Sequence, residues 1–420
     1  MPKRPTVASL KKVTPENLER LGAGRLAEIL ADVAQNRPEL KRRLRMELAA
    51  DQGAEHLAVE VDKRLASLET SKGRISWRQR GAFVRDVEAL RVLIAERLAA
   101  QDAEGARMRM WQLMASHRRV TARLRDRDGA LAAVFQRVAA DLGDLLSAGD
   151  SASGGAALAE AIAADPLGWA PRLDALLQKV SPELAHVALV RLSADARATA
   201  SWLPMLRALA DATGDADAYR ATFTAEALRD PSVAAEVAGR LLAAARLAEA
   251  GEVLEAARPK AGALKRAPEP DFAWESAWIE LLERSGRPEE AQAARWASFE
   301  RTLSAERARD YVRRLPDFDD VEAEQKAFEI AAAHADIGRG LRFLADWPAP
   351  AEAARTIAAR EEEVGRMAPE DAEAIAAKLR VRFPDAAHLL LRKAAAAAFR
   401  RRDFATCDRL TAEADALAAE

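Results

Sequence analysis

The densest group of side chains able to do acid–base or metal chemistry is acidic. Asp317, Asp319 and Asp320 lie in a Leu-Pro-Asp-Phe-Asp-Asp stretch and are followed by Glu322 and Glu324. Carboxylates at this density suit a general acid or the oxygen ligands of a divalent cation. Carboxylates also accept backbone N–H bonds at a helix start and complement the helix dipole there. We expect Asp319 or Asp320 to cap a helix, and cation binding by the cluster stays open.

Other groups that carry enzyme chemistry are sparse. The five histidines, at positions 56, 117, 186, 334 and 388, are separated by 54 residues or more, so none has local metal-ligand spacing. The single cysteine, Cys407, excludes an intramolecular disulfide and a multi-thiolate zinc site. We expect Cys407 to pack as a small apolar residue. The sequence therefore predicts a protein without enzymatic activity, metal or cofactor.

A short basic stretch contains an aromatic residue. Trp77 is interleaved with four cations, Lys72, Arg74, Arg78 and Arg80. Base stacking on tryptophan, combined with arginine–phosphate contacts, suits single-stranded nucleic acid. The alternative, which we favour here, is that Trp77 anchors a helix start in the core while the cations face solvent.

The elements that must position these residues are expected to be helices. Half of the 420 residues are hydrophobic and only 5% are aromatic, with alanine and leucine supplying most of the apolar share. Such a chain has little to build strands with, whereas Ala, Leu, Arg and Glu are strong helix formers. Apolar stripes at helical spacing support this, for example Leu26, Ile29, Leu30 and Val33. The predicted fold class is all-α.

Charge divides the chain. The 64 basic and 66 acidic residues give a net −2, but residues 1–150 hold 28 basic and 21 acidic residues (+7), so residues 151–420 carry −9. Residues 72–127 alone hold 14 basic and 6 acidic residues. The Asp-Ser-Ala-Ser-Gly-Gly stretch at 150–155 has the composition of a linker. We predict a basic N-terminal helical domain, 1–150, followed by an acidic helical domain, 151–420.

The second half contains a weak internal repeat. Arg246-Leu-Ala-Glu-Ala and Arg287-Pro-Glu-Glu-Ala share a frame 41 residues apart, and Arg401-Arg-Asp-Phe-Ala405 is a third, weaker copy. Ala250, Ala291 and Ala405 would let two antiparallel helices approach closely. The pattern predicts a degenerate, tetratricopeptide-like α-solenoid, with an irregular helical domain as the alternative.

Three tryptophans cluster within this region. Trp274 and Trp278 are four residues apart, hence on one helix face, and Trp296 follows in the next predicted helix. Core packing is the default expectation. The functional interpretation is a protein-binding groove on the concave solenoid surface, with Arg295 and Arg342 as further contacts.

Three segments resemble a bacterial, all-helical family known as a domain of unknown function. They are residues 125–143 (Arg-Asp-Arg-Asp-Gly-Ala-Leu…), 286–306 (Gly-Arg-Pro-Glu-Glu-Ala-Gln…) and 315–324 (Leu-Pro-Asp-Phe-Asp-Asp…), the second being the most specific. Similar helical regions follow some SWIM-type zinc-binding modules. The resemblance implies an all-helical fold and no catalytic residues, and the zinc module itself needs several cysteines, which this chain lacks.

The function predicted from the sequence is that of a non-enzymatic scaffold or adaptor that binds a partner protein. Nucleic-acid binding by the basic region is the alternative. The first residues, Met-Pro-Lys-Arg-Pro, are not followed by an apolar stretch, and no run approaches the length of a membrane span. We therefore expect a cytoplasmic protein without membrane contact; its oligomeric state is left open.

Overall fold

The computed structural model describes residues 13–195, 199–259, 272–316, 318–347 and 349–419. All regular secondary structure within these ranges is helical, which confirms the predicted all-α fold class. No helix in the described part of the chain is long and apolar enough to span a bilayer.

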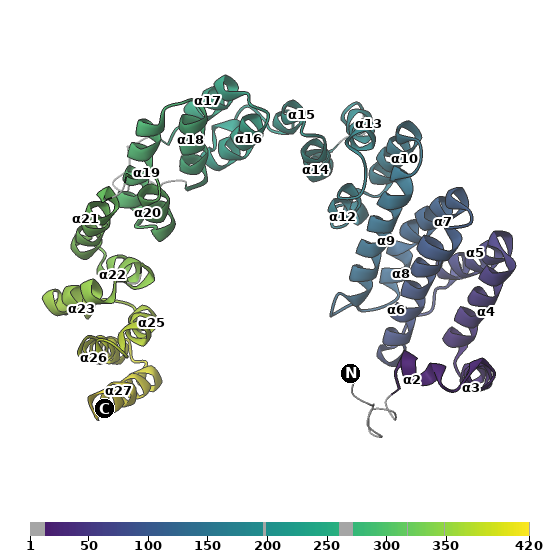
Figure 1. Cartoon of the computed structure of the whole chain (residues 1–420), viewed down its shortest axis with the longest axis horizontal. Coiled ribbons are helices and arrows are strands. Elements are labelled where there is room, and N and C mark those ends of the chain that lie inside the picture. The colour runs from purple at the N-terminus through teal and green to yellow at the C-terminus, as the bar shows by residue number, and fades with distance from the viewer. Residues whose placement is uncertain (1–12, 196–198, 260–271, 317, 348, 420) are drawn as a thin grey trace, which may run out of the picture. The chain divides into compact units, whose positions relative to one another are not determined.

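The chain folds into two compact units, residues 1–222 (unit 1) and 223–420 (unit 2) (Figure 1). The helices of unit 1 are α2 (Pro15–Glu19), α3 (Ala23–Gln35), α4 (Pro38–Gln52), α5 (Ala54–Thr70), α6 (Trp77–Val92), the π-helical turn η1 (Leu93–Leu98), α7 (Ala103–Ala115), α8 (His117–Ala122), α9 (Ala130–Ser147), α10 (Ser151–Ala164), α11 (Pro166–Trp169), α12 (Leu173–Leu177), α13 (Pro182–Ser193), η2 (Ala200–Trp202), α14 (Leu203–Thr213) and α15 (Ala216–Ala221).

Unit 2 is also built from short helices joined by turns. Its elements are η3 (Ala227–Arg229), α16 (Pro231–Ala243), α17 (Leu247–Ala256), α18 (Phe272–Arg284), α19 (Pro288–Thr302), α20 (Ala305–Val312), α21 (Asp319–Ala333), α22 (Ile337–Asp346), α23 (Pro350–Ala359), α24 (Glu361–Val364), α25 (Pro369–Leu379), α26 (Pro384–Arg400) and α27 (Phe404–Ala419). Proline opens many of these helices, because its missing N–H costs nothing in the first turn.

The core of unit 1 is built from apolar stripes at helical spacing. Leu57, Val61, Leu65 and Leu68 of α5 are all fully or nearly fully buried. Val87 and Leu90 of α6 are buried as well, and so is the apolar stripe of α9, which includes Val134, Val138 and Leu142. Burying such side chains contributes about 1.5–3 kcal/mol each, so these stripes define the core of this unit.

The apolar stripe that predicts a helix at residues 26–33 lies on α3 as expected, but most of it is exposed. Ile29, Leu30 and Val33 are each more than one-third exposed, and Ala34 is the buried residue of α3. In α4, Leu48 is exposed whereas Met46 faces inward. The periodicity was sufficient to predict the helices, but it does not show which neighbour covers the apolar face.

The linker expected at residues 150–155 is wrong. Asp150 is the N-cap of α10, where its carboxylate accepts a 2.7 Å bond from the Ser153 N–H. Gly154 and Gly155 are buried because α10 packs closely on α13. A Cβ on Gly155 would lie 2.6 Å from the Leu184 carbonyl oxygen. The small residues here serve a close helix contact. The division of the chain into two compact units falls after residue 222.

The repeated frame in unit 2 corresponds to helical hairpins. Ala245, Gly286 and Arg402 occupy the same place before the second helix of each copy, and all have positive φ, between 58° and 70°. In the first copy the next residue, Arg246, pairs with Glu249 at 2.6 Å. In the second copy Arg287 pairs with Glu290 in the same way, at 2.5 Å. The repeat therefore encodes the turn between paired helices.

The alanines expected at the helix contacts are buried in two of three cases. Ala250 and Ala291 have no exposed surface. Ala405 is exposed, so the prediction for the third copy is wrong. In that hairpin Ala394 and Ala398 of α26 are buried instead, and the preceding helix supplies the small residues.

His117 has a packing role inside unit 1. An Arg172 N–H donates to its Nε2, and its ring meets Phe135 edge-on at 4.9 Å. Burial, together with the charge of Arg172, lowers the pKa of His117 from 6.5 to about 4, so the ring is neutral at pH 7. The His117 side chain therefore joins α8, α9 and the start of α12.

Among the described residues, no group of three or more His, Cys, Asp or Glu is arranged to hold a metal ion.

Candidate nucleic-acid interface

Two basic segments that are distant in sequence meet at one end of unit 1. The first is residues 71–76, which connect α5 to α6, and the second is residues 123–129, which connect α8 to α9. The Ile75 N–H donates to the Arg123 carbonyl at 2.8 Å, and Arg123 Nε donates to the Gly73 carbonyl at 3.0 Å. These reciprocal bonds fix the two segments side by side.

The second segment is held by its own helix cap. Both carboxylate oxygens of Asp126 accept backbone N–H bonds, from Leu131 at 3.2 Å and from Ala132 at 2.8 Å. Asp126 is therefore turned toward α9 and satisfies its unpaired N–H groups. The flanking residues Arg125 and Arg127 are exposed on either side of it.

Arginines from both segments line one surface cavity. Its volume is about 720 Å³, and no acidic residue contributes to its wall. The lining residues are Arg74, Ile75, Trp77, Arg80, Ala122, Arg123, Leu124, Arg125 and Arg127. The cavity thus combines a small apolar floor with five guanidinium groups, which favours an anionic ligand that also has an apolar face.

Trp77 does not anchor the core. It is the first residue of α6, and 80% of its surface is exposed. The helix itself starts where predicted, after Ser76, whose N–H donates to Gln79 Oε1 at 3.4 Å. The expected anchoring is wrong because α6 begins at Trp77, nearly three turns before its first buried residue, Val87. Core packing does not explain why a largely exposed tryptophan lies among arginines.

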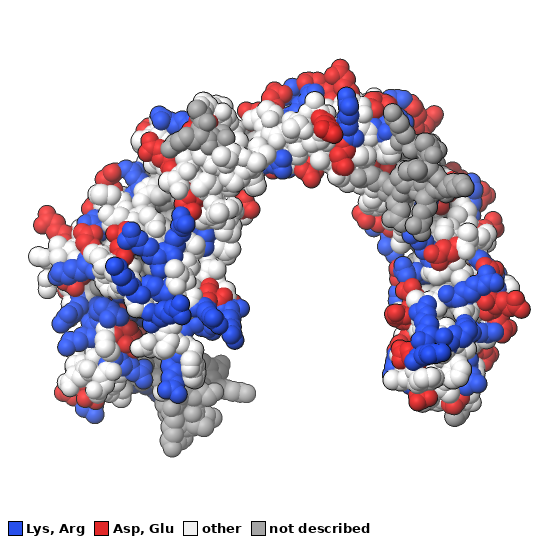
Figure 2. Space-filling model, turned by 180° about the vertical axis from the view of Figure 1, so that it is seen from behind, with Lys and Arg blue, Asp and Glu red and all other residues white. Residues whose placement is uncertain are grey.

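Two of the five cavity arginines are already engaged. Arg80 pairs with Asp128 at 2.5 Å, and the Arg123 guanidinium lies 5.7 Å from the centre of the Phe83 ring. Within the described part of the chain, Arg74, Arg125 and Arg127 have no ion pair. Figure 2 shows Lys and Arg side chains gathered on the face of unit 1 turned toward the viewer. The cavity therefore has an uncompensated positive charge, to which the N-terminus of α6 adds its partial charge.

Of the predicted nucleic-acid residues, the structure places three in the cavity: Arg74, Trp77 and Arg80. Lys72 is exposed in the first segment outside the cavity wall, and Arg78 lies over the Trp77 ring at 5.2 Å. The sequence interpretation missed the other three arginines, Arg123, Arg125 and Arg127. Their alternation at every second position was a usable signal, but nothing local predicts that they meet a segment some 50 residues earlier.

The residues predicted to bind a protein partner are spread over unit 2. Trp274 and Trp278 stack in parallel on α18, with ring centres 5.5 Å apart, and Arg258 lies over both rings. Trp274 is buried, and its Nε1–H donates to the Leu254 carbonyl at 2.9 Å. This pair joins α17 to α18, as core packing requires, and only Trp278 keeps partial exposure.

Arg295 and Trp296 of α19 also have internal partners. Arg295 is 1% exposed and forms ion pairs with Glu283 and Asp310. The half-buried Trp296 donates from Nε1 to Glu300 at 2.7 Å, and its ring contacts Tyr311 at 4.9 Å. Arg295 thus stabilises the contact of α19 with its neighbours. The Trp296 ring also meets Phe299 at 5.2 Å and the Lys326 ammonium at 5.0 Å.

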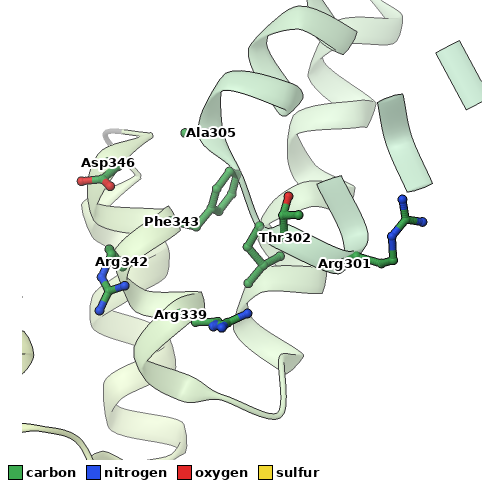
Figure 3. Close-up of a pocket in the computed structure, with 8 residues that line it drawn as sticks. Arg301, Thr302, Ala305, Arg339, Arg342, Phe343 and Asp346 are labelled. Carbon is green, nitrogen blue, oxygen red and sulfur yellow. The ribbon is translucent and has the colours of Figure 1, made fainter. Parts of the chain in front are cut away.

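Arg342 lies elsewhere, at a cavity of about 350 Å³ between α19 and α22 (Figure 3). Its guanidinium pairs with Asp371 at 2.8 Å. Arg301 on the opposite wall pairs with Glu275, and Asp346 pairs with Lys378 at 2.5 Å. The charged side chains of this cavity are therefore paired with other residues of the same chain. A partner-binding role of the five predicted residues stays a prediction.

The acidic cluster opens a helix, as expected. Asp319 and Asp320 are the first two residues of α21, and Asp320 Oδ1 accepts from the Val321 N–H at 2.9 Å. The cap position itself is Phe318, without a side-chain bond, so the carboxylates act in the first turn rather than as the N-cap. Asp317 lies outside the described residues, and whether the cluster also binds a cation stays a prediction.

These observations define an all-helical protein with a basic, aromatic surface cavity. The chain belongs to a family of unknown function, DUF6880, whose sequence model matches residues 8–205 and 191–420. No curated protein and no solved structure matches the chain significantly. The comparisons give no support for the resemblance to helical regions that follow SWIM-type zinc modules.

Proposed function

We propose that this protein is a non-enzymatic nucleic-acid-binding protein that holds phosphates in the cavity of unit 1. The observation that carries the proposal is the convergence of Arg74, Arg125 and Arg127, all exposed and without ion pairs in the described structure, around a wall free of acidic residues. Phosphate contacts from arginine supply most of the affinity in nucleic-acid binding. The account also explains why residues 72–127 carry such a surplus of basic residues.

The test is a binding titration with a fluorescein-labelled single strand of about 15 deoxythymidines, in which fluorescence anisotropy measures the fraction bound. Three phosphate contacts predict a slope of about −2 for log affinity against log salt concentration. Affinity is thus expected to fall about 15-fold between about 50 and about 200 mM salt. Absence of binding at the lower salt concentration would contradict the proposal.

An adaptor function is the second candidate, favoured by a groove in unit 2. Two adjoining cavities, of about 610 and 480 Å³, share Ala351, Arg382 and Phe383 and run over α23 and α26. Phe328 and Trp347 supply further apolar wall, and Arg382 is exposed without an ion pair among the described residues. Glu324, Glu352 and Asp385 also line the groove, so this surface fits a partner segment with a large apolar side chain and a single carboxylate placed at Arg382. On this account the hairpins of unit 2 stack as a tetratricopeptide-like solenoid.

Selection of a displayed peptide library on the intact protein tests the adaptor function. We expect enriched peptides to combine an aromatic or aliphatic residue with Asp or Glu, and to bind the Arg382→Glu variant at least about tenfold more weakly, by loss of one charge pair. Arg366→Glu, an exposed arginine of unit 2 outside the groove, serves as the matched control and should bind normally. Peptides insensitive to Arg382→Glu would contradict this use of the groove. The cytoplasmic location remains a prediction.

A further inference from the structure

The exposed indole of Trp77 has two different faces. The guanidinium carbon of Arg78 lies 5.2 Å from the ring centre and covers one of them. In the described part of the chain no aromatic ring or second cation is placed over Trp77. A cation on one face of an indole leaves the other face available for stacking, and every nucleobase has a π-face that can occupy it.

The space beside this ring is large enough to admit a base. Ile75, Ala122 and Leu124 give the cavity an apolar floor, and its volume of about 720 Å³ falls in the range that encloses small ligands. The unpaired arginines lie around the cavity, where the phosphates before and after such a base would pass. A base inside an intact duplex is already stacked on both sides and cannot enter a cavity of this kind without being flipped out.

We propose that the cavity binds single-stranded nucleic acid by stacking one unpaired base on the free face of Trp77, while Arg74, Arg125 and Arg127 hold the neighbouring phosphates. This inference rests on the proposed nucleic-acid function and adds the recognition of the base. It distinguishes the site from one that binds any polyanion, because inorganic polyphosphate offers the same charge without a base.

The proposal is tested with three labelled probes, with inorganic polyphosphate as an unlabelled competitor, and with three proteins. The probes are the labelled deoxythymidine strand, a strand of equal length in which every base is replaced by an abasic residue, and the deoxythymidine strand paired with its complement. The proteins are the wild type, Trp77→Ala and Trp77→Phe. Because Trp77 is exposed, neither substitution is expected to change the thermal unfolding of the protein, which is measured alongside.

We expect Trp77→Ala to weaken binding of the single strand about 5- to 100-fold, the range of base–aromatic stacking, and Trp77→Phe to recover much of that loss. The wild type should bind the abasic strand as weakly as Trp77→Ala binds the normal strand, and the duplex should also bind more weakly. The salt slope should stay the same in Trp77→Ala, because no phosphate contact is removed.

The outcomes separate the two proposals. Equal affinity of the wild type for the normal and abasic strands, together with unchanged binding by Trp77→Ala, would overturn base stacking and leave the phosphate site intact. Polyphosphate that displaces the strand equally well from the wild type and from Trp77→Ala would support that simpler site. No binding of any probe would overturn both the phosphate site and the stacking.

Discussion

Replacing Arg74, Arg125 and Arg127 together by glutamine is expected to reduce the affinity for a single-stranded oligonucleotide about 100-fold at about 50 mM salt. Each arginine–phosphate contact is assumed to contribute about 1 kcal/mol, and three such losses correspond to about two orders of magnitude. The side chains are exposed and have no ion pair in the described structure, so their removal should leave the helices intact. Anisotropy titrations with the labelled strand measure the effect.

A matched control separates this site from the general charge of unit 1. Arg20, Arg45 and Arg97 are exposed arginines of the same unit that do not line the cavity. Changing these three to glutamine removes the same charge, and we expect an affinity within about threefold of the wild type, because only weak long-range attraction is lost. Equal losses in both triple variants would show that the positive charge acts diffusely and that the cavity is not the binding site.

Gly155→Val is expected to destabilise unit 1 by about 3 kcal/mol or more. A Cβ at this position would lie 2.6 Å from both the Leu184 carbonyl oxygen and the Val187 Cβ, on the facing helix α13. One of these contacts is backbone, so the clash is relieved only if α10 and α13 separate, which is the costly form of overpacking. Hydrogen exchange of the α10 and α13 amides, read by mass spectrometry, reports the loss in this unit alone.

Gly24→Ala is the control for Gly155→Val. Gly24 lies in α3, where an added Cβ meets no atom within 4 Å. Alanine there should not destabilise unit 1, because its Cβ meets no atom and alanine is the stronger helix former. Unchanged exchange in Gly155→Val would mean that α10 does not pack closely on α13 and would restore the linker interpretation of residues 150–155.

The sequence predicts local structure well and tertiary contacts poorly. Helix propensity and apolar spacing were sufficient for the all-α class and for the buried stripe of α5. The same spacing predicted the α3 helix, but it could not show that the apolar face of α3 is largely exposed, because a single stripe carries no information about what covers it. The Gly-Gly pair at 154–155 has a loop composition in isolation, and only the neighbouring helix shows its packing role.

At the candidate site, too, the sequence predicted the local motif but not the contact between distant segments. Trp77 and its neighbouring cations were found as a motif, since they are consecutive in the sequence. Arg123, Arg125 and Arg127 were not connected to them, because the contact depends on backbone bonds such as Ile75 N–H to Arg123 C=O. The wrong expectation for Trp77 has a clear origin as well: most tryptophans in proteins are highly buried, and its exposure follows from how far α6 extends beyond its buried residues.

The measurement that tests the central claim most directly is the salt dependence of single-strand binding in the wild type and in the variant lacking Arg74, Arg125 and Arg127. The slope counts the phosphates that the protein neutralises, independently of other contributions to affinity. The account predicts a slope of about −2 for the wild type and close to zero for the triple variant. The same slope in both proteins would contradict the assignment of the phosphate site to this cavity.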